Sequence, residues 1–210
     1  MRFLSYDGIL AQIVRYIGRL ILLNICYILC CLPVFTFGAA TTALYTVFLN
    51  DREDERLVRR YFKAFKDNFK QATKIWLVFL LLLVVLIGDY YCLFAFDFSG
   101  ENVAWIVTII ISVVYLSITS FVFPLQAHYE NRPRTTIRNA VVLGLGLILL
   151  GVVLNCVTFL PAIVYLVSED LYVNVMIWWI PVWFALAAQI NALILGWTFR
   201  KIQPEEKKEE

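Results

Sequence analysis

Five polar side chains stand inside long apolar stretches of the chain: Asn24, Thr41, Asp89, Asn155 and Gln189. Polar groups are costly in the hydrocarbon of a membrane, so residues of this kind pair with one another or contact an ion or a solute. We therefore regard the five as candidates to line a polar cavity. For the amides and the threonine, hydrogen bonding between helices is the alternative role.

Asp89 is the one ionisable residue among the five. It follows a long uncharged run, and no base in the same segment can neutralise it. Two interpretations stay open: a water-exposed carboxylate in the outer interface, or a buried contact to an ion or substrate.

No pattern typical of an enzyme accompanies these residues. The sequence has no GxSxG, P-loop or HExxH motif and no pair of carboxylates deep in an apolar segment. His128 is the only histidine, and no cysteine or acidic cluster has the spacing to join it around a metal. The five cysteines lie in apolar segments without CxxC spacing, which is typical of small packing residues. We expect no enzymatic activity, no cofactor, no metal and no nucleic-acid partner.

The composition identifies the elements that must hold these residues. With 61% hydrophobic residues, 16% charged residues and a mean hydropathy of +0.77, the chain has too few polar groups to cover a soluble domain. Its apolar runs are continuous and about 20 residues long, as in membrane helices, whereas barrel strands alternate. We predict an all-α, polytopic bundle of transmembrane helices in one domain, residues 1–200, with a charged, disordered tail, residues 201–210. The predicted spans are residues 13–33, 34–50, 75–96, 103–125, 139–167 and 172–198.

The topology depends on the uncharged stretch from Leu20 to Asn50, which Pro33 divides because proline ends helices. If this stretch is a hairpin, six spans place every Lys and Arg, 18 in all, on the cytoplasmic side with both termini. If it crosses once, there are five spans and the N-terminal arginines lie outside. We expect six. The segment 34–50 reaches only about 25 Å as a helix, so re-entry is its alternative.

Small residues recur at helical spacing in this short segment. Gly38 and Thr42 form one small-xxx-small pair, and Ala39 and Ala43 form another. Such pairs let two helices approach closely, so these four residues are predicted to pack against a neighbouring helix.

The sizeable polar connection, residues 51–74, is predicted to be a cytoplasmic amphipathic helix. Acids gather in its first turn and bases follow, as the helix dipole favours. Apolar residues recur at spacings of three and four beside lysines, which describes a helix with one apolar face. Two occupants of that face stay open: anionic lipid headgroups or a partner protein. The candidate contact residues are Val58, Phe62, Phe65, Lys66 and Phe69.

Three stretches together resemble the YesL-like family of bacterial integral membrane proteins: Leu32-Pro33-Val34, the run Gly38 to Tyr45, and the run Phe62 to Ala72. Residues 124–140 are similar more loosely. The family is one of unknown function. The resemblance implies a bacterial plasma membrane and an association with oligosaccharide uptake systems, and it supplies no catalytic residues.

Together these observations lead to an expected function. The chain is expected to be a non-enzymatic accessory or assembly factor of a carbohydrate uptake system, with the lipid bilayer and the permease or ATPase subunits of a sugar transporter as its partners. The alternative is a small-solute carrier or membrane-embedded substrate-binding subunit that uses the polar residues within its spans.

Overall fold

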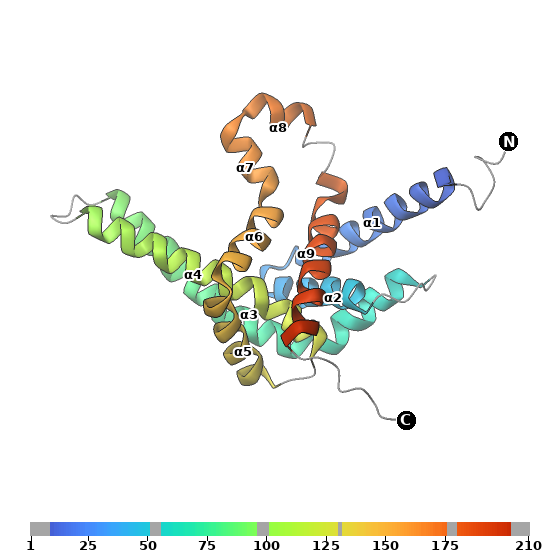
Figure 1. Ribbon diagram of the computed structural model, residues 1–210, viewed down its shortest axis with the longest axis horizontal. Coiled ribbons are helices and arrows are strands. Elements are labelled where there is room, and N and C mark those ends of the chain that lie inside the picture. Colours follow the sequence, from blue (N-terminus) through green and yellow to red (C-terminus); the bar gives the residue numbers. More distant parts are fainter. Residues whose placement is uncertain (1–8, 51–55, 96–100, 130–131, 176–179, 203–210) are drawn as a thin grey trace.

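The structure, a computed structural model, describes residues 9–50, 56–95, 101–129, 132–175 and 180–202, and every element within these ranges is helical (Figure 1). The predicted first turn at residues 51–55 and residues 203–210 of the predicted tail lie outside them. Lys201 and Ile202, predicted to belong to that tail, are instead the last residues of helix α9. The elements are α1 (Ile9–Cys31), the 3-10 turn η1 (Val34–Thr36), α2 (Phe37–Leu49), α3 (Leu57–Ala95), α4 (Glu101–His128), α5 (Pro133–Gly146), α6 (Ile148–Thr158), α7 (Leu160–Val167), α8 (Glu169–Val175) and α9 (Ile180–Ile202).

The chain turns between α1 and α2 at Pro33. The Thr36 hydroxyl donates to the carbonyl oxygens of Cys30 and Pro33, and the Thr36 amide donates to the Pro33 carbonyl at 2.9 Å, which closes the 3-10 turn η1. Helix α2 then runs back beside α1, and the hydroxyls of Tyr27 and Thr41 lie 3.3 Å apart.

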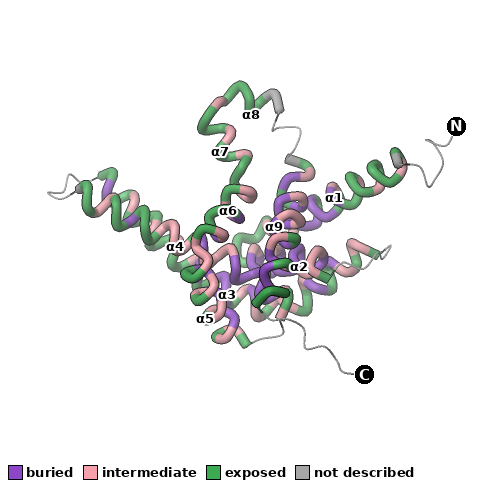
Figure 2. The backbone as a smooth tube through the Cα atoms, viewed as in Figure 1, coloured by how far each residue is buried: buried purple, intermediate pink, exposed green. Residues whose placement is uncertain are grey.

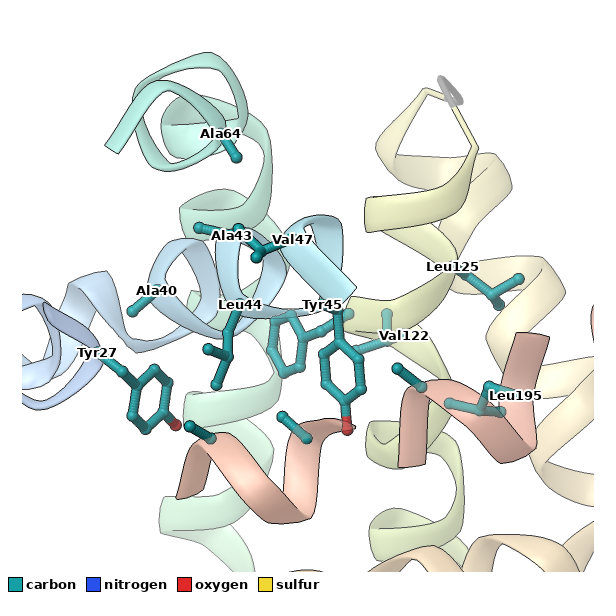
Figure 3. Close-up of a cluster of buried hydrophobic side chains, with 14 of the residues drawn as sticks. Tyr27, Ala40, Ala43, Leu44, Tyr45, Val47, Ala64, Val122, Leu125 and Leu195 are labelled. Atoms are coloured by element: carbon teal, nitrogen blue, oxygen red, sulfur yellow. The ribbon is translucent and has the colours of Figure 1, made fainter. Parts of the chain in front are cut away.

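Helix α2 is the centre of the bundle. Figure 2 shows it in the most buried region, and the small residues Gly38, Ala39, Thr42 and Ala43 are all buried. Its apolar side chains meet those of α4 and α9, as Figure 3 shows for Leu44, Tyr45 and their neighbours. This burial explains how a helix of only 13 residues can stay ordered.

One continuous helix, α3, covers both the predicted cytoplasmic helix and the third predicted span. It has 39 residues. Its front half, residues 57–76, packs on α2, where the Tyr61 hydroxyl donates to the Ala40 carbonyl at 3.4 Å. Its back half, residues 77–95, packs on α4, where the Tyr115 hydroxyl donates to the Phe79 carbonyl at 3.0 Å.

The predicted span 139–167 is not one helix. Helices α5 and α6 meet at a bend of 98°, and α7 follows after a second interruption. Packing against α4 explains the first break: a Cβ on Gly144 would lie 2.7 Å from the Ile118 Cα, and the Ser117 hydroxyl donates to the Gly144 carbonyl at 2.8 Å. Glycines on both sides of the bend let the chain follow α4 closely.

Four helices among the described residues are long and apolar enough to cross a membrane: α1, α3, α4 and α9. The bent pair of α5 and α6 raises the number to five if it counts as one span. Helix α2 belongs to a shorter apolar segment, Val34–Leu49. The chain is thus an all-helical bundle with several candidate spans, and the predicted count of six requires α2 to cross as well.

Contacts with α9 give the relative directions of the first two helices. Along α1, Tyr16 hydrogen-bonds Gln189, while Asn24, further on, hydrogen-bonds Ala185. Helix α1 is therefore antiparallel to α9. Helix α2 runs parallel to α9, because Asn191 hydrogen-bonds Tyr45 and the later Gly196 lies next to the later Leu49.

Candidate functional site

The structure does not bring the five predicted cavity residues together. Each of them hydrogen-bonds a helix other than its own: Asn24 accepts from the Ala185 amide, Thr41 pairs with Tyr27, Asp89 accepts from Thr108, Asn155 donates to Ser120, and Gln189 accepts from Tyr16. These bonds join α1 to α9, α1 to α2, α3 to α4, α4 to α6, and again α1 to α9. In this structure the five residues hold helices together.

Asp89 is exposed and lies in the back half of α3. The Thr108 hydroxyl of α4 donates to its Oδ2 at 2.5 Å. Its side chain therefore serves the contact between α3 and α4.

A large polar cavity lies elsewhere, where the ends of four helices meet. We call it the basic basin. Its volume is about 1190 Å³, which exceeds the range of about 300–1,000 Å³ common for small-molecule sites. Its walls are the last turns of α2 and α4, the front half of α3 and the start of α5. The lining residues are Thr46, Val47, Leu49, Asn50, Arg60, Lys63, Ala64, Asp67, Asn68, Gln71, Gln126, Ala127, His128, Tyr129, Arg132 and Pro133.

A hydrogen-bonded network centred on Gln126 forms part of the lining. Gln126 is only 6% exposed, and its Oε1 accepts from Gln71 Nε2 at 2.9 Å and from the Thr136 hydroxyl at 3.1 Å. Its Nε2 donates to Asn68 Oδ1 at 3.4 Å. The network links α3, α4 and α5 through uncharged polar groups, so the positions of these walls depend on one another.

The charged residues of the basin are mostly basic. Within the described ranges, three bases, Arg60, Lys63 and Arg132, and one carboxylate, that of Asp67, line it. Arg60 donates through Nη2 to the Asn50 carbonyl at 2.6 Å, which places a positive charge at the C-terminal end of α2. The basin thus combines excess positive charge with amide groups.

Aromatic rings connect the basin to the end of α9. The His128 ring stacks on Phe199 with centroids 5.3 Å apart, and Tyr129 packs on the same phenylalanine at 5.8 Å. Burial raises the pKa of Tyr129 above its ordinary value. The last turns of α4 and α9 are therefore held at one end of the bundle.

The front half of α3 divides the predicted contact residues between two environments. Tyr61 and Ala64 form its buried face, while Phe62 is 46% exposed and Lys66 is exposed as well. Val58 and Phe65 are partly buried and pack against the core, and Phe65 meets the ring of Phe69 at 5.5 Å.

Sequence reasoning missed the residues of the basin network. Asn68 and Gln71 share a face of α3 at a spacing of three, next to the predicted contact residues Phe65 and Phe69. Gln126 lies near the end of an apolar run and gives no signal on its own. The spacing of Asn68 and Gln71 is the one feature of the sequence that indicates a shared polar face, because their shared hydrogen-bond partner, Gln126, lies on another helix.

A second, smaller cavity of about 510 Å³ lies at the start of α9, beside α7. Aromatic rings dominate its lining, which consists of Thr158, Phe159, Pro161, Ala162, Tyr165, Tyr172, Trp183 and Phe184. Across the described ranges, no group of three or more His, Cys, Asp and Glu residues could hold a metal ion.

Comparison with known proteins gives one match. Residues 20–90 match the model of a family described as "Protein of unknown function, DUF624". The matched segment contains the second half of α1, all of α2 and most of α3, including the α3 wall of the basin. No curated protein and no solved structure gives a significant match. The chain is thus similar to this family over the segment that carries its central helix packing.

Proposed function

We propose that this chain is a non-enzymatic accessory or assembly factor of a bacterial carbohydrate uptake system. It acts in the plasma membrane through protein contacts on the outer face of α3, which we define as Phe62, Lys66 and Lys70. The carbohydrate connection comes from what the YesL-like resemblance implies, and the structure supports the mode of action.

One observation carries the proposal: the front half of α3 has two different faces. Tyr61, at 0% exposure, faces the core, whereas the neighbouring Phe62 remains 46% exposed among exposed lysines. An exposed aromatic ring beside bases is typical of a surface that receives an apolar, acidic segment of a partner. Cytoplasmic segments of permease or ATPase subunits are the proposed partners.

The length of α3 makes this face accessible. A helix of 39 residues is about 58 Å long, about twice the thickness of the hydrocarbon core. The helix is therefore too long to lie wholly within the hydrocarbon, and its charged first turns extend toward the polar side. The helix is also unbroken through residue 74. A front half that lay flat on headgroups would need a bend there, so the continuous helix favours a protein partner over the lipid surface.

The proposed topology has six crossings and both termini in the cytoplasm. Two observations support it: α1 is antiparallel to α9, and α2 returns parallel to α9. An even number of crossings brings both ends of the chain to the same side, where the positive-inside rule also places the bases.

A pull-down from mild detergent with a C-terminal tag tests the function. We expect sugar permease or ATPase subunits to co-purify, and Phe62→Asp to abolish their recovery. Ile202→Asp is the matched control, because Ile202 is also an exposed apolar residue, 50% accessible, on another helix. Recovery of a homo-oligomer alone, or equal loss in both variants, contradicts the proposal.

The basic basin favours a second candidate, a small-solute carrier or membrane-embedded substrate-binding subunit. Its volume of about 1190 Å³ is large enough for an oligosaccharide unit. Purified protein in liposomes would then bind or move a labelled oligosaccharide without any other subunit. Protein that does neither is evidence against a carrier and leaves the accessory role in place.

A further inference from the structure

We propose that the basic basin is a binding site for phosphate-bearing anions. The inference rests on the lining of the basin and does not depend on the proposed accessory function. Two sources supply the same chemistry: a phosphorylated small solute, or the headgroup of an anionic phospholipid.

The charge of the lining selects an anion. Among the lining residues that the structure describes, Arg60, Lys63 and Arg132 contribute positive charge from α3 and from the residue before α5, and Asp67 contributes a carboxylate. Lys63 and Arg132 are exposed, so their side chains can turn toward a ligand. Flexible bases around a concave surface attract anions, and a phosphate accepts several hydrogen bonds from them.

Uncharged polar groups in the same lining define the position of a ligand. Gln126 is held by Gln71 and Thr136, and its own Nε2 donates to Asn68. A lining whose amides are already oriented costs less conformational entropy when a ligand binds. The basin therefore offers charge on mobile side chains and hydrogen-bonding groups on a fixed network.

The location of the basin makes both sources reachable. It is lined by the end of α2, the front half of α3 and the end of α4, next to the apolar parts of the same helices. A headgroup could enter from the interface, and a solute could enter from water.

Calorimetric titration of purified protein in nanodiscs tests the proposal. Inorganic phosphate and glucose 6-phosphate are titrated into nanodiscs of phosphatidylcholine, with glucose as the uncharged control. We expect saturable binding of both phosphates and none of glucose. Two outcomes overturn the proposal. One is that glucose binds as well as the phosphates do. The other is that the protein binds no phosphate in these discs and also shows no preference for anionic lipid.

A second arm separates the two sources. Thermal stability is compared between nanodiscs of phosphatidylcholine and nanodiscs that also contain phosphatidylglycerol. Stabilisation by phosphatidylglycerol without solute binding identifies a lipid headgroup, and solute binding without lipid preference identifies a soluble anion. Either result supports the site, provided that the basin variants abolish the binding or the stabilisation.

Variants of the basin bases decide where the anion binds. Lys63→Gln and Arg132→Gln should each weaken phosphate binding about tenfold, as expected for the loss of one charge-assisted contact. Lys66→Gln and Arg138→Gln are the controls, since these bases are exposed on the same two segments but do not line the basin. Equal weakening in the controls shows general surface charge and refutes the site.

Discussion

Gly38 shows how one residue can set the distance between two helices. A Cβ at this position would lie 2.5 Å from the Cβ of Trp76 and 2.7 Å from the Ala72 carbonyl oxygen. Both contacts are shorter than a Cβ tolerates, and one involves backbone. Helix α2 can therefore lie this close to α3 only with glycine at residue 38.

Gly38→Ala should destabilise the protein by about 1–3 kcal/mol, the cost of overpacking a tight interior. Thermal unfolding in detergent measures the effect. Gly18→Ala is the control within α1, because a Cβ there meets no atom within 4 Å and the gain in helix propensity is about 0.5–1 kcal/mol. If both variants unfold at the same temperature, the close packing of α2 on α3 is refuted.

Helix α3 is the element that joins the polar and apolar regions. Its front half packs on α2 and lines the basic basin, and its back half packs on α4 with many exposed apolar side chains, such as Leu81, Val85 and Phe94. A surface helix on headgroups would need a bend before the span begins. Helix α3 continues unbroken through this point, so the orientation of the front half follows that of the back half.

Spin labels at Lys63 and Val85 test this continuity, in a variant without the native cysteines. Along one continuous helix the two Cα atoms lie about 33 Å apart. A right-angled bend at residue 74 would shorten the separation to about 23 Å. Pulsed electron-electron double resonance in nanodiscs distinguishes the two, and a distribution centred near the shorter distance would contradict the continuous helix.

At the scale of the whole molecule, helix directions relate the two ends of the chain. Tyr16 and Asn24 of α1 meet successively earlier residues of α9, Gln189 and Ala185. Figure 1 shows α2 and α9 at the centre, with α1, the α3–α4 pair and the α6–α8 segment extending outward from them. Burial is concentrated where these segments meet (Figure 2).

Single cysteines at residues 5, 131 and 209 should all react with an impermeant reagent from the cytoplasmic side, and a cysteine at residue 100 from the other side. The antiparallel arrangement of α1 and α9 and the placement of bases both lead to this expectation. The test labels each variant in oriented vesicles and detects the attached reagent by the increase in protein mass. An outside residue 5 with an inside residue 131 would restore five crossings.

The sequence alone was sufficient for the class of protein and for several local features. Continuous apolar runs dictate membrane helices, because a backbone in lipid must satisfy its own hydrogen bonds. Pro33 dictates a helix break since it lacks an amide hydrogen, and the spacing of Gly38 and Thr42 indicates a face that packs closely. These features depend on residues that are near one another in the chain.

Tertiary structure decided which polar groups meet. Gln126 joins Gln71 only when α3 and α4 pack side by side, and the predicted cavity residues spread over several interfaces for the same reason. The break between α5 and α6 also depends on a neighbour, since Gly144 lies against Ile118 of α4. Periodicity along one helix contains no information about the distance to another, so the basin and the bend follow from packing.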